Sequence, residues 1–184
     1  PVTLLITLAL WRLARCWPEG GAATRASSRD LLIGAALCGA AFSTHYYSVF
    51  LALPLVLTIW QARREEGAAS VLGELARQLA AAGVVFLALS PFLLVEPATA
   101  WRDVVANRQI VVDRAASEGL FANLQRYIVL LATLGTTIPV AVLAVAGALL
   151  LIATDRRRAM LLLSFPAGFM LFIANTVPAS RYLN

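Results

Sequence analysis

The chain alternates between long stretches without a charged residue and short segments rich in arginine. The charge-free stretches are residues 31–62, 78–95, 127–154 and 159–180. A transmembrane helix needs about 20 consecutive apolar residues, because the hydrocarbon core of a bilayer is about 30 Å thick. Each stretch is therefore close to or above the length of one membrane span.

The first stretch, residues 31–62, is too long for one span and somewhat short for two. Its 32 residues would extend about 48 Å as one straight helix. Its middle, residues 43–47 (STHYY), holds the only histidine of the chain. This pattern predicts a helical hairpin with His45 at its tip. The spacing of Ala35 and Gly39 also predicts a close contact between helices.

Composition favours a membrane protein over a soluble one. Hydrophobic residues make up 60% of the chain and charged residues only 14%, whereas soluble domains carry about 25% charged residues. We therefore predict an all-α, multi-pass transmembrane domain of about five complete spans plus a truncated one, and we expect residues 1–184 to be part of one polytopic domain. Because the chain starts and stops beside apolar stretches, we expect further segments at both ends.

Turn signals and charges divide the remaining sequence into elements. Residues 1–11 are typical of the end of a truncated span. Further spans are expected at about 79–90, 135–154 and 159–178. The polar residues 63–77 predict a short connection that faces water or head groups. Residues 101–118 carry charges of both signs between valines, which predicts a helix on the membrane surface that residues 121–134 extend.

The net charge of +5 does not indicate nucleic-acid binding, so no nucleic-acid partner is expected. All 15 basic residues are arginines, and they lie between the apolar stretches rather than in one patch. Such residues set the orientation of a membrane protein and contact anionic lipid. A hairpin at 31–62 places ten arginines on one side and five on the other, whereas a single span gives nine and six. The positive-inside rule thus favours the hairpin and puts His45, Glu96 and Arg181 on the non-cytoplasmic face.

No residue pattern indicates a metal site or another cofactor. Cys16 and Cys38 lack the spacing of metal ligands. The sequence also offers no Ser-His-Asp set, no paired catalytic carboxylates and no glycine loop of the type that holds phosphate. We therefore expect no cofactor, and the catalytic residues are not identified in this stretch of sequence.

Three segments, in the same order along the chain, resemble a known family. They are residues 34–47 (GAALCGAAFSTHYY) with the following Pro54, residues 89–96 (LSPFLLVE) and residues 179–184 (ASRYLN). Together they resemble polyprenyl-phosphate-dependent glycosyltransferases of the GT-C type, most closely the dolichyl-phosphate-mannose protein mannosyltransferase-like (family 39) group. Many members of that group carry lysine in place of His45 and aspartate in place of Glu96.

The resemblance implies transfer of a sugar from a polyprenyl-phosphate donor to a protein, lipid or glycan acceptor. It implies an integral membrane protein, in the bacterial cytoplasmic membrane, with its site facing outward. The acidic catalytic loop of the family follows the first transmembrane span, and no segment here matches it. The catalytic residues are therefore expected before the first residue of this sequence.

The resemblance also suggests roles in donor or acceptor binding for six residues. Arg181, followed by Tyr182, is the leading candidate to bind the donor phosphate, because a guanidinium matches phosphate oxygens in pairs. His45 could hydrogen-bond a phosphate or a sugar hydroxyl, and Arg102 is the best placed of the loop arginines for phosphate. Glu96 could accept hydrogen bonds from sugar hydroxyls, and Tyr46 could stack on a sugar ring.

Each of these residues also has an ordinary structural interpretation. Arg181 could extend to the lipid head groups, and His45 could bind a backbone carbonyl at the hairpin tip. Tyr46 and Tyr47 suit an aromatic belt, while Glu96 suits the end of a helix and Arg102 a solvated surface.

Two other classes of membrane protein stay open. A transporter or flippase would explain a polar residue in an interrupted apolar segment, but it predicts a repeated hydropathy pattern that this sequence does not show. A non-catalytic membrane scaffold predicts polar groups that scatter instead of converging.

Overall fold

The structure is a computed structural model that describes residues 2–17, 28–112, 119–135 and 137–175. Within these ranges every regular element is helical, which confirms the all-α prediction. The chain divides into two units that we describe separately. Unit 1 comprises Pro1–Val95 and Met160–Phe165, and unit 2 comprises Glu96–Ala159 and Pro166–Asn184.

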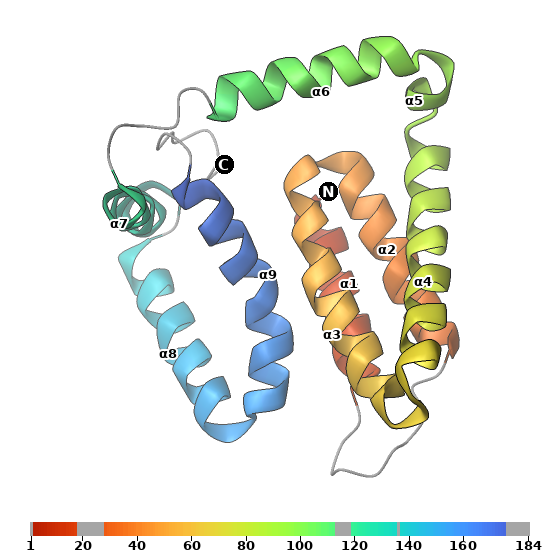
Figure 1. Ribbon diagram of the computed structural model, residues 1–184. Helices are drawn as coiled ribbons and strands as arrows, with labels where there is room; N and C mark the ends of the chain where they lie inside the picture. The colour runs from red at the N-terminus through yellow and green to blue at the C-terminus, as the bar shows by residue number, and fades with distance from the viewer. Residues whose placement is uncertain (1, 18–27, 113–118, 136, 176–184) are drawn as a thin grey trace. The chain divides into compact units, whose positions relative to one another are not determined.

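Unit 1 is a bundle built around helix α2 (Figure 1). Its elements in chain order are α1 (Val2–Arg15), α2 (Ser28–Thr44), the 3₁₀ helix η1 (Tyr46–Leu51), α3 (Ala52–Arg63), the 3₁₀ turn η2 (Arg64–Glu66), α4 (Ala68–Leu89) and the short α5 (Phe92–Val95). Helix α2 packs most extensively against α4 and α1. Its position between two helices explains why its middle is rich in small residues.

The predicted hairpin is present. Helix α2 ends at Thr44, and the chain turns back through η1 into α3 (Figure 1). Arg63 Nη2, at the end of α3, lies 3.3 Å from Ser28 Oγ at the start of α2. Since the two ends of the segment meet, residues 31–62 cannot form one long helix.

Close helix contacts in unit 1 depend on two glycines of α2. A Cβ atom on Gly39 would lie 2.9 Å from the carbonyl carbon of Ala82 and 3.0 Å from its Cα, so α4 can approach only a glycine at this point. A Cβ on Gly34 would lie 2.9 Å from Leu13 Cδ2 in α1. The predicted small-residue contact is thus confirmed at Gly39, and Ala35 is fully buried beside it. Close packing of this kind is what holds helices together in lipid, where burial from water contributes little.

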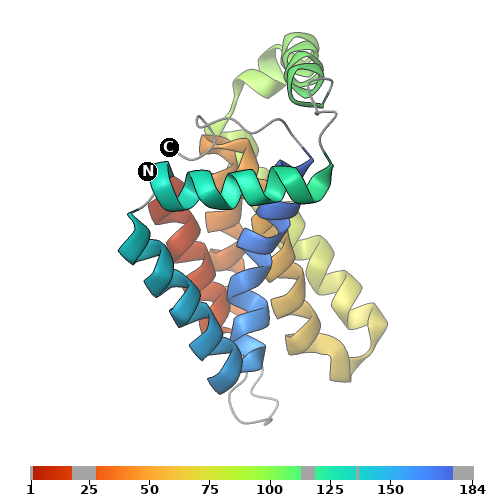
Figure 2. The same ribbon diagram turned by 90° about the vertical axis from the view of Figure 1, so that its left-hand side faces the viewer.

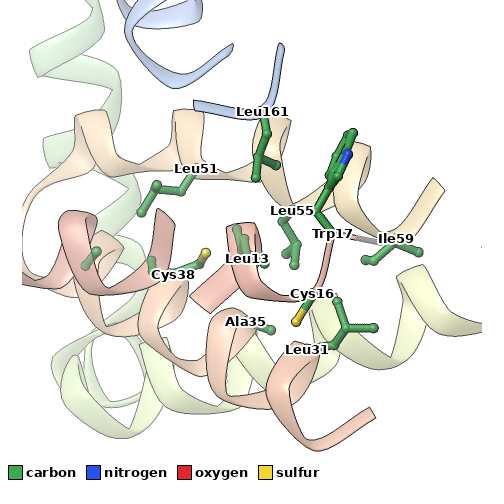
Figure 3. Close-up of a cluster of buried hydrophobic side chains, with 12 residues drawn as sticks. Leu13, Cys16, Trp17, Leu31, Ala35, Cys38, Leu51, Leu55, Ile59 and Leu161 are labelled. Carbon is green, nitrogen blue, oxygen red and sulfur yellow. The ribbon is translucent and has the colours of Figure 1, made fainter. Parts of the chain in front are cut away.

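Apolar side chains from the two arms of the hairpin and from α1 form the core of unit 1 (Figure 3). Leu13, Leu31 and Leu55 are almost completely buried there, as is Leu161 from the Met160–Phe165 segment. Thr58, inside the same hairpin, satisfies its hydroxyl by donating to the carbonyl of Pro54 at 2.8 Å. The polar atom therefore adds no unpaired donor to the apolar core.

Helix α4 begins earlier than the sequence predicted. Residues 63–77 were expected to form a connection, but only η2 and Gly67 do, and α4 starts at Ala68. Gly67 takes φ = 97°, a left-handed conformation that suits glycine and separates η2 from α4. The charged residues of the next turns then fit in the helix because Glu74 is paired with Arg63 and Arg77, at 3.4 and 2.7 Å.

Unit 2 contains α6 (Pro97–Val112), α7 (Leu120–Leu130), the π-helical segment η3 (Leu131–Gly135), α8 (Ile138–Thr154) and most of α9 (Arg156–Ala174). Helix α8 turns sharply away from α7 after η3 (Figure 2). Asp155 caps α9 by accepting a hydrogen bond from the backbone N–H of Arg158 at 3.0 Å. Because of this cap, α9 begins at Arg156 and includes the three arginines in its first turn. The sequence had predicted a start three residues later.

Two helices in the described part of the chain, α4 and α9, are long and apolar enough to cross a membrane. A third span is possible if the bent pair Leu120–Thr133 and Ile138–Thr154 counts as one. The helices α1, α2, α3 and α8, with 14, 17, 12 and 17 residues, are each shorter than the roughly 20 residues of a typical membrane span. The predicted number of five spans therefore stays a prediction.

Candidate functional site

The tip of the hairpin is formed by a local break in the helix at His45. Near the end of α2 the hydroxyls of Ser43 and Thr44 donate to the carbonyls of Ala40 and Ala41, at 2.8 and 2.7 Å. Such back-bonding competes with helix propagation. His45 itself is extended, with φ = −158° and ψ = 131°, and η1 begins at the next residue.

Three rings gather at this break. The centroid of the His45 ring lies 4.0 Å from that of Tyr47 and 4.9 Å from that of Tyr46. The two tyrosine rings are 6.2 Å apart and nearly edge-on to each other. His45 and Tyr46 are exposed, whereas Tyr47 is half-buried. The tip thus presents an imidazole and a phenol ring, with Tyr47 behind them as support.

The surroundings of His45 favour its neutral form. Partial burial lowers the pKa of His45 below its ordinary value of 6.5, because the charged imidazolium loses hydration. At neutral pH the ring therefore offers one N–H donor and one acceptor nitrogen. This chemistry suits hydrogen bonds to hydroxyl or phosphate oxygens better than permanent ion pairing.

The segment Ser90–Pro91, which follows α4, lies at the same end of unit 1 as the hairpin tip. Gly39 of α2 contacts Ala82 of α4, and the rings of Phe42 and Phe86 lie 4.7 Å apart. Both helices advance in the same direction between these contacts, so α2 and α4 are parallel. Their C-terminal ends, followed by His45 in one case and by Ser90–Pro91 in the other, therefore lie at the same end of the unit.

Charged groups collect at the opposite end of unit 1. Arg12 pairs with Asp30 at 3.1 Å, and Arg63 contacts Ser28, Glu66 and Glu74. The sequence has no charged residue in 31–62 or 78–95. Among the residues that the structure describes in Pro1–Val95, the hairpin tip is therefore free of formal charge, and the arginines lie a helix length away.

The other predicted site residues belong to unit 2 or lie outside the described residues. Glu96 is exposed just before α6, where its backbone carbonyl accepts from the N–H of Ala100 at 3.0 Å. Arg102 is exposed on α6 and lies 3.9 Å from Asp103, too far for a strong ion pair. Both belong to unit 2, whereas His45 and Tyr46 belong to unit 1. Arg181 and Tyr182 lie outside the described residues, so the convergence of these groups stays a prediction.

The sequence did not single out Ser48 near the tip, and it did not rank the two adjacent tyrosines. Tyr47 lies closer to His45 than Tyr46 does, although adjacent tyrosines cannot be ranked from sequence. Ser48 is 1% exposed and lines a pocket between the helices. Its position as a polar residue within the charge-free stretch 31–62 was the one signal that could have drawn attention to it.

Possible metal ligands do not cluster in the described part of the chain. No three His, Cys, Asp or Glu side chains lie close enough there to hold a metal ion. The arrangement at the tip can thus supply hydrogen bonds and ring contacts from its own side chains.

Comparison with protein-family models, with curated proteins and with solved structures finds no match to this chain.

Proposed function

We propose that this chain belongs to a membrane glycosyltransferase that transfers a sugar from a polyprenyl-phosphate donor to an acceptor on the non-cytoplasmic face. One observation supports this function most directly. The segments 34–47 and 89–96, which carry much of the resemblance to GT-C glycosyltransferases, run past the C-terminal ends of the parallel helices α2 and α4, and these two helix ends lie at the same end of unit 1. That end carries an exposed imidazole and aromatic ring instead of charges.

The proposed orientation follows from the separation of charge within unit 1. Arg12, Arg63 and their partners would face the cytoplasm, in keeping with the positive-inside rule. The hairpin tip would then face outward, at the depth where a lipid-linked phosphate meets water. In this arrangement the short helices α2 and α3 enter the membrane together as a hairpin, within a domain of about five spans.

In the proposed reaction an acceptor hydroxyl attacks the anomeric carbon of the donor sugar. The bond between that carbon and the phosphate oxygen breaks, and the polyprenyl phosphate leaves with the electron pair. The hydroxyl proton passes to a carboxylate base, as the resemblance to the family implies. Donors aimed at the leaving phosphate stabilise the charge that develops on it.

The residues of this chain would bind the donor in the proposed reaction. His45 would donate to a phosphate or sugar oxygen, and Tyr46 would contact the sugar ring. Arg181, with Tyr182 and Arg102, would hold the phosphate, and Glu96 would orient hydroxyl groups.

Sugar transfer can be tested in membranes that contain the complete gene product and radiolabelled polyprenyl-phosphate sugars. We expect label to pass to an acceptor. We expect His45→Ala to slow transfer about 10- to 100-fold, the rate change that corresponds to the free energy of one hydrogen bond to a charged group. His45→Asn, which keeps an N–H donor, should recover part of the rate. Arg64→Ala, at the opposite end of unit 1, serves as the matched control. If no polyprenyl-phosphate sugar is consumed by membranes that hold the folded protein, the proposal is wrong.

A transporter is the second candidate, because α7, η3 and α8 form a broken apolar segment and broken helices often line transport sites. Proteoliposomes loaded with labelled solute or lipid-linked sugar would separate the two functions. Movement of an intact substrate without cleavage of the sugar–phosphate bond would favour transport.

A further inference from the structure

An apolar pocket lies in unit 1 just beneath the hairpin tip. It has a volume of about 190 Å³ and is lined by residues of α2, η1, α3 and α4. Phe42 and Phe86, in ring contact, form part of its wall. Ala52 and Gly83 leave the space open, and a Cβ atom on Gly83 would meet no atom within 4 Å.

The rim of the pocket is apolar and exposed. Val49 and Leu79 line the pocket, and 48% and 47% of their surfaces are accessible. In a membrane-embedded bundle, exposed apolar side chains contact lipid chains instead of water. The space next to this rim is thus open to hydrocarbon.

One buried polar group in the pocket has no partner. Ser48 is 1% exposed, and its Oγ forms no hydrogen bond with any residue that the structure describes. Its backbone N–H is already used, donating to the carbonyl of His45 at 3.1 Å. Because a buried hydroxyl without a partner is costly, an acceptor oxygen in the part of the pocket beside Ser48 would stabilise this site.

The depth of the pocket matches the upper part of a lipid chain. Phe42 and Cys38 precede His45 by three and seven residues, which places the pocket roughly 5–10 Å below the tip along α2. If His45 lies at the head groups, Ser48 lies at the depth of the ester carbonyls of glycerolipids, and the rest of the pocket lies at the first carbons of their chains. By comparison with a cavity of about 150 Å³ that holds one benzene, the pocket accommodates roughly seven carbons.

We propose that this pocket binds one acyl chain of a membrane glycerolipid, whose ester carbonyl accepts a hydrogen bond from Ser48 Oγ. The proposal rests on the placement of unit 1 in a membrane and is independent of sugar transfer. A polyprenyl phosphate has no ester carbonyl, so it would leave Ser48 without a carbonyl acceptor.

Photocrosslinking can test this site in membranes that contain the complete gene product. The probe is a diacyl phosphatidylglycerol with a diazirine near the sixth carbon of one chain, and labelled peptides are identified by mass spectrometry. We expect labelling within residues 48–55 and 79–86. Gly83→Leu fills the pocket and should reduce this labelling about tenfold, as loss of a few buried methylene groups predicts. Gly73→Leu adds the same side chain in open space on the same helix and should leave labelling unchanged.

Ser48→Ala tests the hydrogen bond separately. It should weaken labelling by the ester lipid about two- to tenfold, as expected for one hydrogen bond. A diether lipid with the same chains should label weakly in both the wild type and Ser48→Ala. If Gly83→Leu does not accumulate, Ala52→Leu fills the pocket from α3. Equal labelling of the pocket-filled variant and the wild type would overturn the proposal, and so would stronger labelling by a diazirine polyprenyl phosphate that the ester lipid fails to displace.

Discussion

Arg63 donates to Ser28 over 3.3 Å, although 35 residues separate them in sequence. The contact joins the end of α3 to the start of α2 and closes the hairpin opposite His45. As an exposed hydrogen bond it contributes little stability by itself. The contact shows how the hairpin is arranged, because it places residues 28 and 63 at one end of the unit and residue 45 at the other.

The hairpin predicts opposite accessibility of its tip and its ends. In intact cells, a cysteine replacing Tyr46 should react with a membrane-impermeant maleimide, whereas a cysteine replacing Arg64 should react only after permeabilisation. The native Cys16 gives a low background, because burial, aided by the nearby Asp30 carboxylate, raises its pKa to about 11 and leaves almost no thiolate at neutral pH. Equal labelling of positions 46 and 64 in intact cells would contradict the proposed topology.

The hairpin could be predicted because its causes are local. A charge-free run longer than one span, with a polar and aromatic centre, needs a break, and the hydroxyls of Ser43 and Thr44 provide it within one turn. The direction of α4 relative to α2 could not be read from sequence in the same way. It depends on Gly39 meeting Ala82, a contact between residues far apart in the chain.

The start of α4 was mispredicted for a related reason. Glu74 and Arg77 are typical of a water-facing connection when they are considered alone. In the structure, Arg63 from the preceding helix pairs with Glu74, and Gln78 donates to the same carboxylate at 2.5 Å. The partner that makes the charge acceptable in a helix comes from another element, and periodicity does not reveal it.

Replacing Glu74 should destabilise unit 1 strongly. Its side chain is only 9% exposed and bonds Arg63, Arg77 and Gln78. Glu74→Ala would remove one of the two carboxylates that pair with the largely buried Arg63 guanidinium, Glu66 remaining at 3.0 Å, and would remove the acceptor of Gln78, so we expect a loss of about 1–3 kcal/mol. Unfolding in mixed micelles with increasing denaturing detergent measures this change. Glu65→Ala, at an exposed position of η2, should change stability by less than about 0.5 kcal/mol.

The approach of α2 and α4 at Gly39 leads to a matched pair of substitutions. Gly39→Ala forces a methyl group against the Ala82 backbone, which cannot move without separating the helices. The expected cost is about 1–3 kcal/mol. Gly73→Ala, in α4, meets no atom within 4 Å and should be neutral or stabilising by up to about 1 kcal/mol. Similar stability of the two variants in the same detergent titration would mean that the helices are not in close contact at Gly39.

The neutral state of His45 predicts a pH dependence with a definite sign. Burial lowers its pKa in the folded protein below the ordinary value of 6.5, so the unfolded chain binds the proton more readily than the folded protein. The free energy of unfolding is therefore undiminished by His45 above pH 6.5, declines as the pH falls toward the pKa of His45 in the folded protein, and changes no further below that pKa.

The pKa of His45 can be measured directly by NMR titration of ¹³C-labelled histidine, because the chain has only one histidine. Tyr47→Ala should expose the partly covered ring of His45 further, move the midpoint upward toward 6.5 and shrink this pH dependence. A midpoint above 6.5 in the wild type would show instead that a negative group faces His45 at the tip.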